Sequence, residues 1–299
     1  MPRTIQFLIA LLLGALLYVF DAVSSTYSAV LALILMLLFG VPHGAVDHKI
    51  HQSTSKDRNL AKYIGKYLLI SGGYVLWWFI DPAKALFIFI LLSAYHFGQE
   101  LLEDRKVLSG AGTLLTSMIW GAAILIGPLL FSIDEVNPYI EIVTGFSLVA
   151  IKNQVVLGAV GVIYATMLGH LIFLFQRKLV SNTDTLGLLI FMLVNLTLHL
   201  FLDFVLAFTI YFICFHSLNA FRHQFEWLAA RKKDYTIRKF VLDLSLFALI
   251  AIFGIALIVF VVDPSNMNTL IFIFFMLISL ITLPHAITLD HFYKVRGAN

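Results

Sequence analysis

Charged residues are scarce in this 299-residue chain: Asp, Glu, Lys and Arg make up only 12%, against 61% hydrophobic residues. A water-soluble domain usually has about 25% charged residues, so the composition excludes one. The single cysteine, Cys214, excludes a disulfide within the chain. The net charge is only +3, and no basic stripe is interleaved with aromatic residues, so nucleic acid is not an expected partner.

Several catalytic motifs are also absent. The sequence has no Gly-x-Ser-x-Gly turn, no phosphate-binding loop and no Cys-x-x-Cys pair. These absences argue against a serine hydrolase of that type, a P-loop nucleotide hydrolase and a dithiol redox protein. Any chemistry must therefore come from other residue types.

Long apolar runs take the place of the missing charges. Ile5 to Phe20 and Val155 to Phe175 approach or reach the roughly 20 residues that a helix needs to cross a bilayer. The runs lack strict apolar–polar alternation, which favours helices over barrel strands. No small-residue cleavage site follows the first run, so we expect it to be retained.

The fold class predicted is all-α: a polytopic transmembrane helix bundle in one integral membrane domain, residues 1–299. About ten spans are expected, with eight to ten allowed. The segment 139–150 can instead be an interfacial helix, and the two short spans around Asp203 can instead be one broken helix. The approximate spans are 5–20, 27–45, 62–80, 84–99, 110–131, 155–176, 186–201, 204–222, 240–262 and 268–290.

The distribution of Lys and Arg predicts the orientation of these spans. With a cytoplasmic N-terminus, every Lys and Arg except Lys84 and Lys152 falls on the inner side. This asymmetry follows the positive-inside rule, so both termini are predicted to be cytoplasmic, in a multi-pass protein of the inner cell membrane. A basic cytoplasmic loop at about 224–239 is expected to contact anionic lipid.

Most of the ten histidines collect at the cytoplasmic helix ends of this topology. Two fall outside the pattern: His51 in a loop, and His199 near an outer helix end. A polar side chain at membrane depth is costly unless it faces the interior and finds partners. The histidines at or near the cytoplasmic ends are His43, His48, His96, His170, His216, His223, His285 and His291.

Four motifs carry all of these histidines except His170. The first reads Gly-Val-Pro-His-Gly-Ala-Val-Asp-His and contains His43 and Asp47. The second is Tyr-His-Phe-Gly-Gln-Glu, and the third is His-Ser-Leu-Asn-Ala-Phe-Arg-His. The last, Pro-His-Ala-Ile-Thr-Leu-Asp-His, resembles the first in placing a histidine directly after a proline. A proline bends a membrane helix and can turn the following histidine inward.

Imidazoles from several helices predict a metal site toward the cytoplasmic side. Neutral imidazole binds iron, zinc, copper or nickel well, and helix bundles build cofactor sites from facing helices. Ligating histidines also need acceptors for their second ring nitrogen, and Asp47, Gln99, Glu100 and Asp290 lie nearby in the sequence.

Each histidine taken singly also has a structural interpretation. Most often such a residue is an interfacial side chain that bonds a carbonyl or a headgroup. For His48, His51 and His291 a solvated position is favoured, and for His170 a helix–helix hydrogen bond is favoured. His199 is interpreted as structural.

The four motifs together resemble the bacteriorhodopsin-related-protein family (Brp/Blh), membrane β-carotene 15,15′-dioxygenases. The resemblance covers most of the chain in order. It implies iron(II) held by histidines, and cleavage of the central double bond of β-carotene by O₂ into two retinal molecules, with a functional link to a microbial rhodopsin. By motif it implies the catalytic iron ligands His43, His96, His216 and His223, with Asp47 and His285 in support.

One spacing departs from the family pattern. The family keeps its late histidine pair one helical turn apart, whereas seven residues separate His216 from His223 here. Both spacings return to one helix face, but seven residues rise roughly 10 Å against about 6 Å for four. Both histidines can reach one metal only if the helix is distorted or the metal lies midway, and Asn219 is an alternative participant.

Two other classes of function stay open. Di-iron membrane desaturases and hydroxylases are also rich in histidine, but they use His-x-x-His-His boxes, and no His-His pair occurs in this sequence. A transporter or binding protein could use the histidines to relay protons or metal. The membrane setting fits the dioxygenase. Its substrate, β-carotene, is a hydrocarbon about as long as the roughly 30 Å bilayer core, so it can enter directly from lipid.

Overall fold

The structure is a computed structural model that describes residues 3–105, 107, 113–148, 151–261 and 266–297. In these ranges all regular secondary structure is helical, which confirms the all-α prediction. The described chain forms two compact units. Unit 1 comprises Met1–Met36, Ser93–Asn137 and Leu148–Asn219; unit 2 comprises Leu37–Leu92, Pro138–Ser147 and Ala220–Asn299. The single domain predicted from the sequence stays a prediction.

Nine helical segments in the described residues are long and apolar enough to cross a membrane, within the predicted range of eight to ten. The missing tenth is 62–80: α4 (Leu60–Ile80) forms a helix there, but Lys62, Lys66 and several Tyr and Gly residues lower its hydropathy. Residues 110–112 and 262 of the predicted spans lie outside the described residues. Large apolar side chains such as Phe260 and Ile80 are exposed, as lipid-facing residues are. The chain is therefore an integral membrane protein.

The two segments left open by the sequence are now assigned. α8 (Ile133–Thr144) is a 12-residue helix, too short to span a bilayer. Around Asp203 the chain forms two helices rather than one, because Leu202 and Asp203 leave the helical conformation between α10 (Asn182–Phe201) and α11 (Phe204–Tyr211). The Glu135 carboxylate accepts a hydrogen bond from the Phe204 backbone N–H at 2.8 Å, which satisfies one free donor at the start of α11.

Unit 1 is built around α1 (Arg3–Val23), which packs on α10 and α11, while α9 (Asn153–Gln176) packs on α6 (Thr113–Gly121) and on α7 (Gly127–Phe131). Two π-helical segments interrupt its helices: η1 (Ala122–Ile126) follows α6, and η2 (Phe212–Ser217) follows α11. α2 (Ser25–His43) and α5 (Pro82–Asp104) contribute residues to both units.

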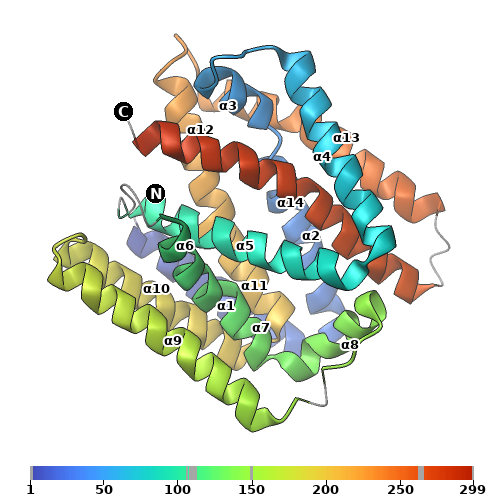
Figure 1. The fold of residues 1–299 in the computed structure, drawn as a ribbon, viewed down its shortest axis with the longest axis vertical. Coiled ribbons are helices and arrows are strands. Elements are labelled where there is room, and N and C mark those ends of the chain that lie inside the picture. The colour runs from blue at the N-terminus through green and yellow to red at the C-terminus, as the bar shows by residue number, and fades with distance from the viewer. Residues whose placement is uncertain (1–2, 106, 108–112, 149–150, 262–265, 298–299) are drawn as a thin grey trace. The chain divides into compact units, whose positions relative to one another are not determined.

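Unit 2 holds α3 (Asp47–Thr54), α4 and α14 (Met267–Gly297), which pack on one another (Figure 1). It also holds α12 (Leu218–Ala229) from Ala220 onward, and α13 (Ile237–Val261). Its core includes Trp227 of α12 and Phe292 of α14, whose ring centroids lie 5.4 Å apart. The Lys49 ammonium pairs with the Asp243 carboxylate and so joins α3 to α13.

Two glycines let α5 and α6 approach within backbone contact in unit 1. A Cβ atom at Gly98 would lie 1.9 Å from the Ser117 carbonyl oxygen, and one at Gly121 would lie 1.6 Å from the Ala94 carbonyl oxygen. Small residues allow such close packing between membrane helices. Gly98 is the glycine of the Tyr-His-Phe-Gly motif, so the motif glycine holds the helix that carries His96.

We predict that Gly98→Ala and Gly121→Ala each destabilise the fold. The added methyl group meets backbone atoms that cannot move aside, and overpacking of this kind costs about 3 kcal/mol. Thermal unfolding of the purified protein in detergent measures the loss. Gly161→Ala in α9 is the matched control, because nothing lies within 4 Å of a Cβ at that position. Equal unfolding temperatures for Gly98→Ala and Gly161→Ala would show that the stability of the fold does not depend on this backbone contact.

Candidate metal centre

Unit 1 buries two of the predicted histidines with a carboxylate between helices. His96 of α5 and His216 of η2 are each only 1% exposed, and their ring centroids lie 5.0 Å apart with the rings nearly perpendicular. The Glu100 carboxylate lies one helical turn after His96 and contacts His216 Nδ1. A carboxylate at this nitrogen holds a proton on Nδ1 and leaves the lone pair on Nε2, as in metal-binding histidines.

His216 lies in a π-helical turn. Segments of this kind are rare and frequently occur at functional sites, because the extra residue changes where side chains project. A distortion of the helix was one of the two ways in which the sequence allowed His216 and His223 to reach one metal, the other being a metal that lies midway. The helix is π-helical through Ser217 and regular α-helix from Leu218 onward, so the distortion affects the turn of His216 itself rather than the turns that follow.

Aromatic rings cover the apolar side of His216 in unit 1. Phe97 lies 4.7 Å from the His216 ring, centroid to centroid, and Phe212 lies 5.1 Å from it. Phe97 in turn contacts Phe208 and Tyr211, with centroids 5.8 and 5.6 Å away. The imidazole therefore lies against a dry hydrocarbon wall.

Asn219, an alternative participant in the sequence analysis, is held by two hydrogen bonds in unit 1. Its side-chain N–H₂ donates to the Phe215 carbonyl at 2.8 Å, and its Oδ1 accepts from the Gln6 amide at 2.7 Å. Both side chains are buried. Asn219 thus ties α1 to the helix of His216, a supporting position next to the histidine.

Unit 2 repeats the arrangement with His43, His285 and Asp47. The rings of His43 and His285 meet edge to face at 4.4 Å between centroids. His285 Nδ1 lies 2.8 and 2.9 Å from the two Asp47 carboxylate oxygens. His43 Nδ1 lies 2.7 Å from the Gly40 carbonyl oxygen, which can only accept, so Nδ1 carries the proton and Nε2 keeps its lone pair.

The remaining predicted site residues have other polar neighbours. His223 is buried in unit 2, with Nε2 at 3.3 Å from an Arg222 guanidinium nitrogen and Nδ1 at 3.5 Å from the Tyr293 hydroxyl. Asp290 is partly exposed on α14 and its carboxylate accepts from the Lys294 ammonium at 2.6 Å.

His170 and His199 have the structural roles that the sequence analysis favoured for them. His170 joins α9 to α6, since its Nδ1 accepts from the Trp120 indole N–H at 3.2 Å and its Nε2 lies 3.4 Å from the Thr116 hydroxyl. His199 Nδ1 donates to the Asn195 carbonyl at 2.9 Å, a bond within its own helix.

Sequence reasoning missed several supporting residues. The Gln224 amide donates to the His43 carbonyl at 3.1 Å from a fully buried position, and so ties α12 to the end of α2. Tyr293 lies two turns after His285 and reaches His223. Gln6 lies in the first apolar run. A lone glutamine in a membrane helix was the available signal for Gln6, whereas Gln224 and Tyr293 belong to no pattern in the sequence.

The chemistry of the donors fits a metal ion. His43, His96 and His216 are all buried and offer three imidazole nitrogens, a set that could bind a metal. The hydrogen bonds at the Nδ1 atoms of His43 and His216 fit ligation through Nε2. Carboxylates that orient imidazoles are the usual outer partners of such ligands.

The chain is similar to known proteins. A family model described as "Beta-carotene 15,15'-dioxygenase" matches residues 6–293. A "Beta-carotene 15,15'-dioxygenase" from an uncultured marine bacterium, 66A03, is 41% identical over 71 residues, which cover 22% of this chain and 26% of that protein. A "Probable beta-carotene 15,15'-dioxygenase Blh" from Halobacterium salinarum is 37% identical over 67 residues, 21% of this chain and 19% of that protein.

The aligned segments thus span about a quarter and a fifth of those two curated relatives. No solved structure matches the chain. The family match, in contrast, covers nearly the whole sequence and contains all four histidine motifs. The chain belongs to the β-carotene 15,15′-dioxygenase family.

Proposed function

We propose that this protein cleaves the central 15,15′ double bond of β-carotene with O₂ and releases two molecules of retinal. The observation that carries the proposal is the family match over residues 6–293, which contains the buried histidines paired with carboxylates. Each retinal takes one oxygen atom, so the reaction consumes one O₂ and needs no other reductant.

His43, His96 and His216 are the ligands in this proposal, and iron(II) is the metal. Imidazole suits iron, and three neutral ligands leave coordination positions for other molecules. A bound iron supplies the O₂ chemistry, which is the metal's own. The protein supplies position: Glu100 holds the His216 ring, and the Gly40 carbonyl holds the His43 ring.

The aromatic wall beside His216 gives the substrate its environment. Phe97, Phe208 and Phe212 present hydrocarbon surfaces that suit a conjugated polyene and keep water from the imidazole. β-Carotene dissolves in the bilayer core, so it can enter laterally from lipid without a soluble carrier. In the predicted topology the metal lies toward the cytoplasmic side, and a microbial rhodopsin is the proposed consumer of the retinal.

Expression in a β-carotene-producing bacterium tests the activity. We predict that the orange colour bleaches and that extraction yields retinal, and that His43→Ala, His96→Ala and His216→Ala each abolish both effects and remove the bound iron. Chromatography of the extract and metal analysis of the purified protein are the two measurements. His170→Gln is the control, because His170 bonds Trp120 in unit 1 and belongs to none of the motifs. Persistent colour with well-folded wild-type protein would end the proposal.

Exchange of the two orienting carboxylates for amides should weaken the site without removing a ligand. We predict that Glu100→Gln and Asp47→Asn each lower iron affinity or retinal yield by about 10–100-fold, the usual cost of losing an outer partner of a metal-bound histidine. Iron titration followed by a retinal assay measures it. Glu141→Gln on α8 makes the same chemical change at an exposed carboxylate and should leave both unchanged. Equal losses in all three variants would show a general effect of charge.

The role of His223 has a separate test. Its Nε2 lies near the Arg222 guanidinium, which competes with a metal for the same lone pair. We therefore predict that His223→Ala retains more iron than His43→Ala or His96→Ala, measured by metal analysis on equal amounts of folded protein. Complete iron loss in His223→Ala would restore it as a full ligand, as the family resemblance implies.

A further inference from the structure

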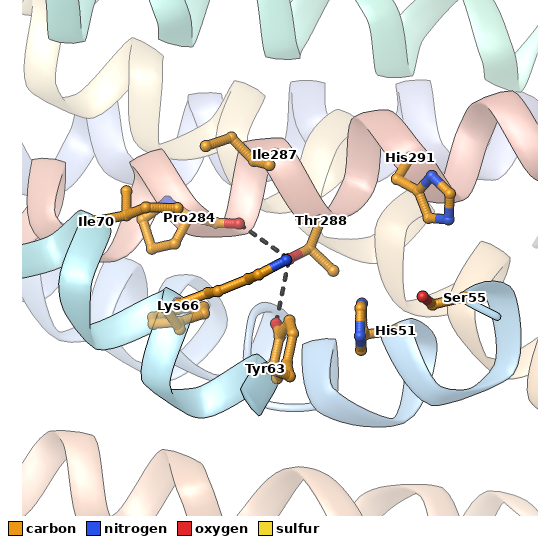
Figure 2. A pocket seen from close by; sticks show the side chains of 10 residues that line it. His51, Ser55, Tyr63, Lys66, Ile70, Pro284, Ile287, Thr288 and His291 are labelled. Carbon is orange, nitrogen blue, oxygen red and sulfur yellow. Dashed lines mark hydrogen bonds between the residues drawn. The ribbon is translucent and has the colours of Figure 1, made fainter. Parts of the chain in front are cut away.

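A cavity with basic and apolar lining residues lies in unit 2, between the end of α3, the first turns of α4 and the second half of α14 (Figure 2). Its volume is about 270 Å³, the volume of roughly nine water molecules. It is too small for a whole carotenoid or lipid. The lining residues are His51, Ser55, Tyr63, Lys66, Tyr67, Ile70, Pro284, Ile287, Thr288 and His291.

The cavity wall is basic. Lys66 and two histidines, His51 and His291, line it, and none of its lining residues in the described chain is a carboxylate. The neighbouring Lys62, in contrast, is committed to Asp57, at 2.5 Å between ammonium and carboxylate. The hydrogen bond from Lys62 holds the pKa of the Asp57 carboxyl below its ordinary value. The cationic group on α4 that is available to a ligand in this cavity is therefore Lys66.

The polar wall is held in place by contacts between its own side chains. The His51 ring stacks on Tyr63, with centroids 4.4 Å apart. The Thr288 hydroxyl donates to the Pro284 carbonyl at 3.0 Å, so the Tyr63 hydroxyl, 3.1 Å away, donates to the Thr288 oxygen. α3, α4 and α14 are thus joined around the cavity before any ligand binds.

The cavity is amphipathic along its length. Figure 2 shows His51, Ser55 and His291 at one end and Ile70, Pro284 and Ile287 at the other, with the Lys66 side chain extending toward the middle. Lys66 lies six residues into α4, about 9 Å along the helix axis from Leu60. Basic groups at a helix end above an apolar wall match the boundary between headgroups and acyl chains.

We propose that this cavity binds the phosphodiester headgroup of an anionic phospholipid. The Lys66 ammonium and the N–H groups of His51 and His291 would donate to phosphate oxygens, while Ile70 and Ile287 would contact the first carbons of the lipid. The site is distinct in residues from the proposed metal ligands. It would anchor the ends of α4 and α14 to the leaflet that carries anionic lipid.

Native mass spectrometry of the full chain released from nanodiscs tests the proposal. We expect the wild type to retain one phosphatidylglycerol per chain, and Lys66→Gln to retain it roughly fivefold less often for the loss of one cationic contact. His51→Gln should also lower retention. Lys62→Gln, one turn earlier on α4 and outside the cavity, is the matched control and should retain as much as the wild type.

Three outcomes would overturn the proposal. Equal losses for Lys62→Gln and Lys66→Gln would show general attraction to a charged surface. Equal retention of phosphatidylcholine by the wild type would show that the charge of the lipid is irrelevant. The third outcome has two parts: excess inorganic phosphate displaces the phosphatidylglycerol, and the protein binds phosphate equally well in phosphatidylcholine nanodiscs. Together they would identify free phosphate as the ligand. Unfolding temperatures in phosphatidylcholine nanodiscs confirm that each variant is folded.

Discussion

The pairing of a buried imidazole with an acceptor is the constraint on which this structure depends. In a membrane helix bundle, a polar ring away from water must be hydrogen-bonded, or its burial costs several kcal/mol. His216 meets this demand through Glu100, His285 through Asp47 and His43 through the Gly40 carbonyl. The same bonds decide which ring nitrogen keeps its lone pair. The hydrogen bonds that compensate for burying the rings therefore also leave one ring nitrogen of each histidine with a lone pair that a metal could use.

Both units use this pairing, but they support it differently. In unit 1 the supports are aromatic rings and a π-helical turn, so the surroundings of His216 are dry. In unit 2 the supports are polar: the Gln224 amide on the His43 carbonyl, and the Tyr293 hydroxyl near His223. A hydrocarbon substrate suits the first environment. Polar support suits unit 2, because α2 ends there at His43 and the last carbonyls of the helix need hydrogen-bond donors.

Much of the fold was predictable because membrane helices have a strong signal. Continuous apolar runs predicted ten spans, nine of which the structure forms as long apolar helical segments, and the two separate spans predicted around Asp203 are confirmed. α4 forms a helix at the predicted span 62–80, but its lysines and glycines lower its hydropathy, so it is not among the nine segments apolar enough to cross a membrane. The motifs contain His43, His96, His216 and both carboxylates, all of which the structure buries. They could not identify Gln6 or Gln224, because these side chains act on backbone or amide groups that are distant in the sequence.

The backbone contact between α5 and α6 has a consequence for redesign of the site. Because no side-chain atom separates Gly98 from Ser117, or Gly121 from Ala94, the depth and rotation of His96 are set by main-chain atoms. A larger residue at either glycine would meet backbone atoms and disturb the packing of α5 on α6. Libraries built on the proposed activity should vary the phenylalanine side chains near His216 and keep Gly98 and Gly121.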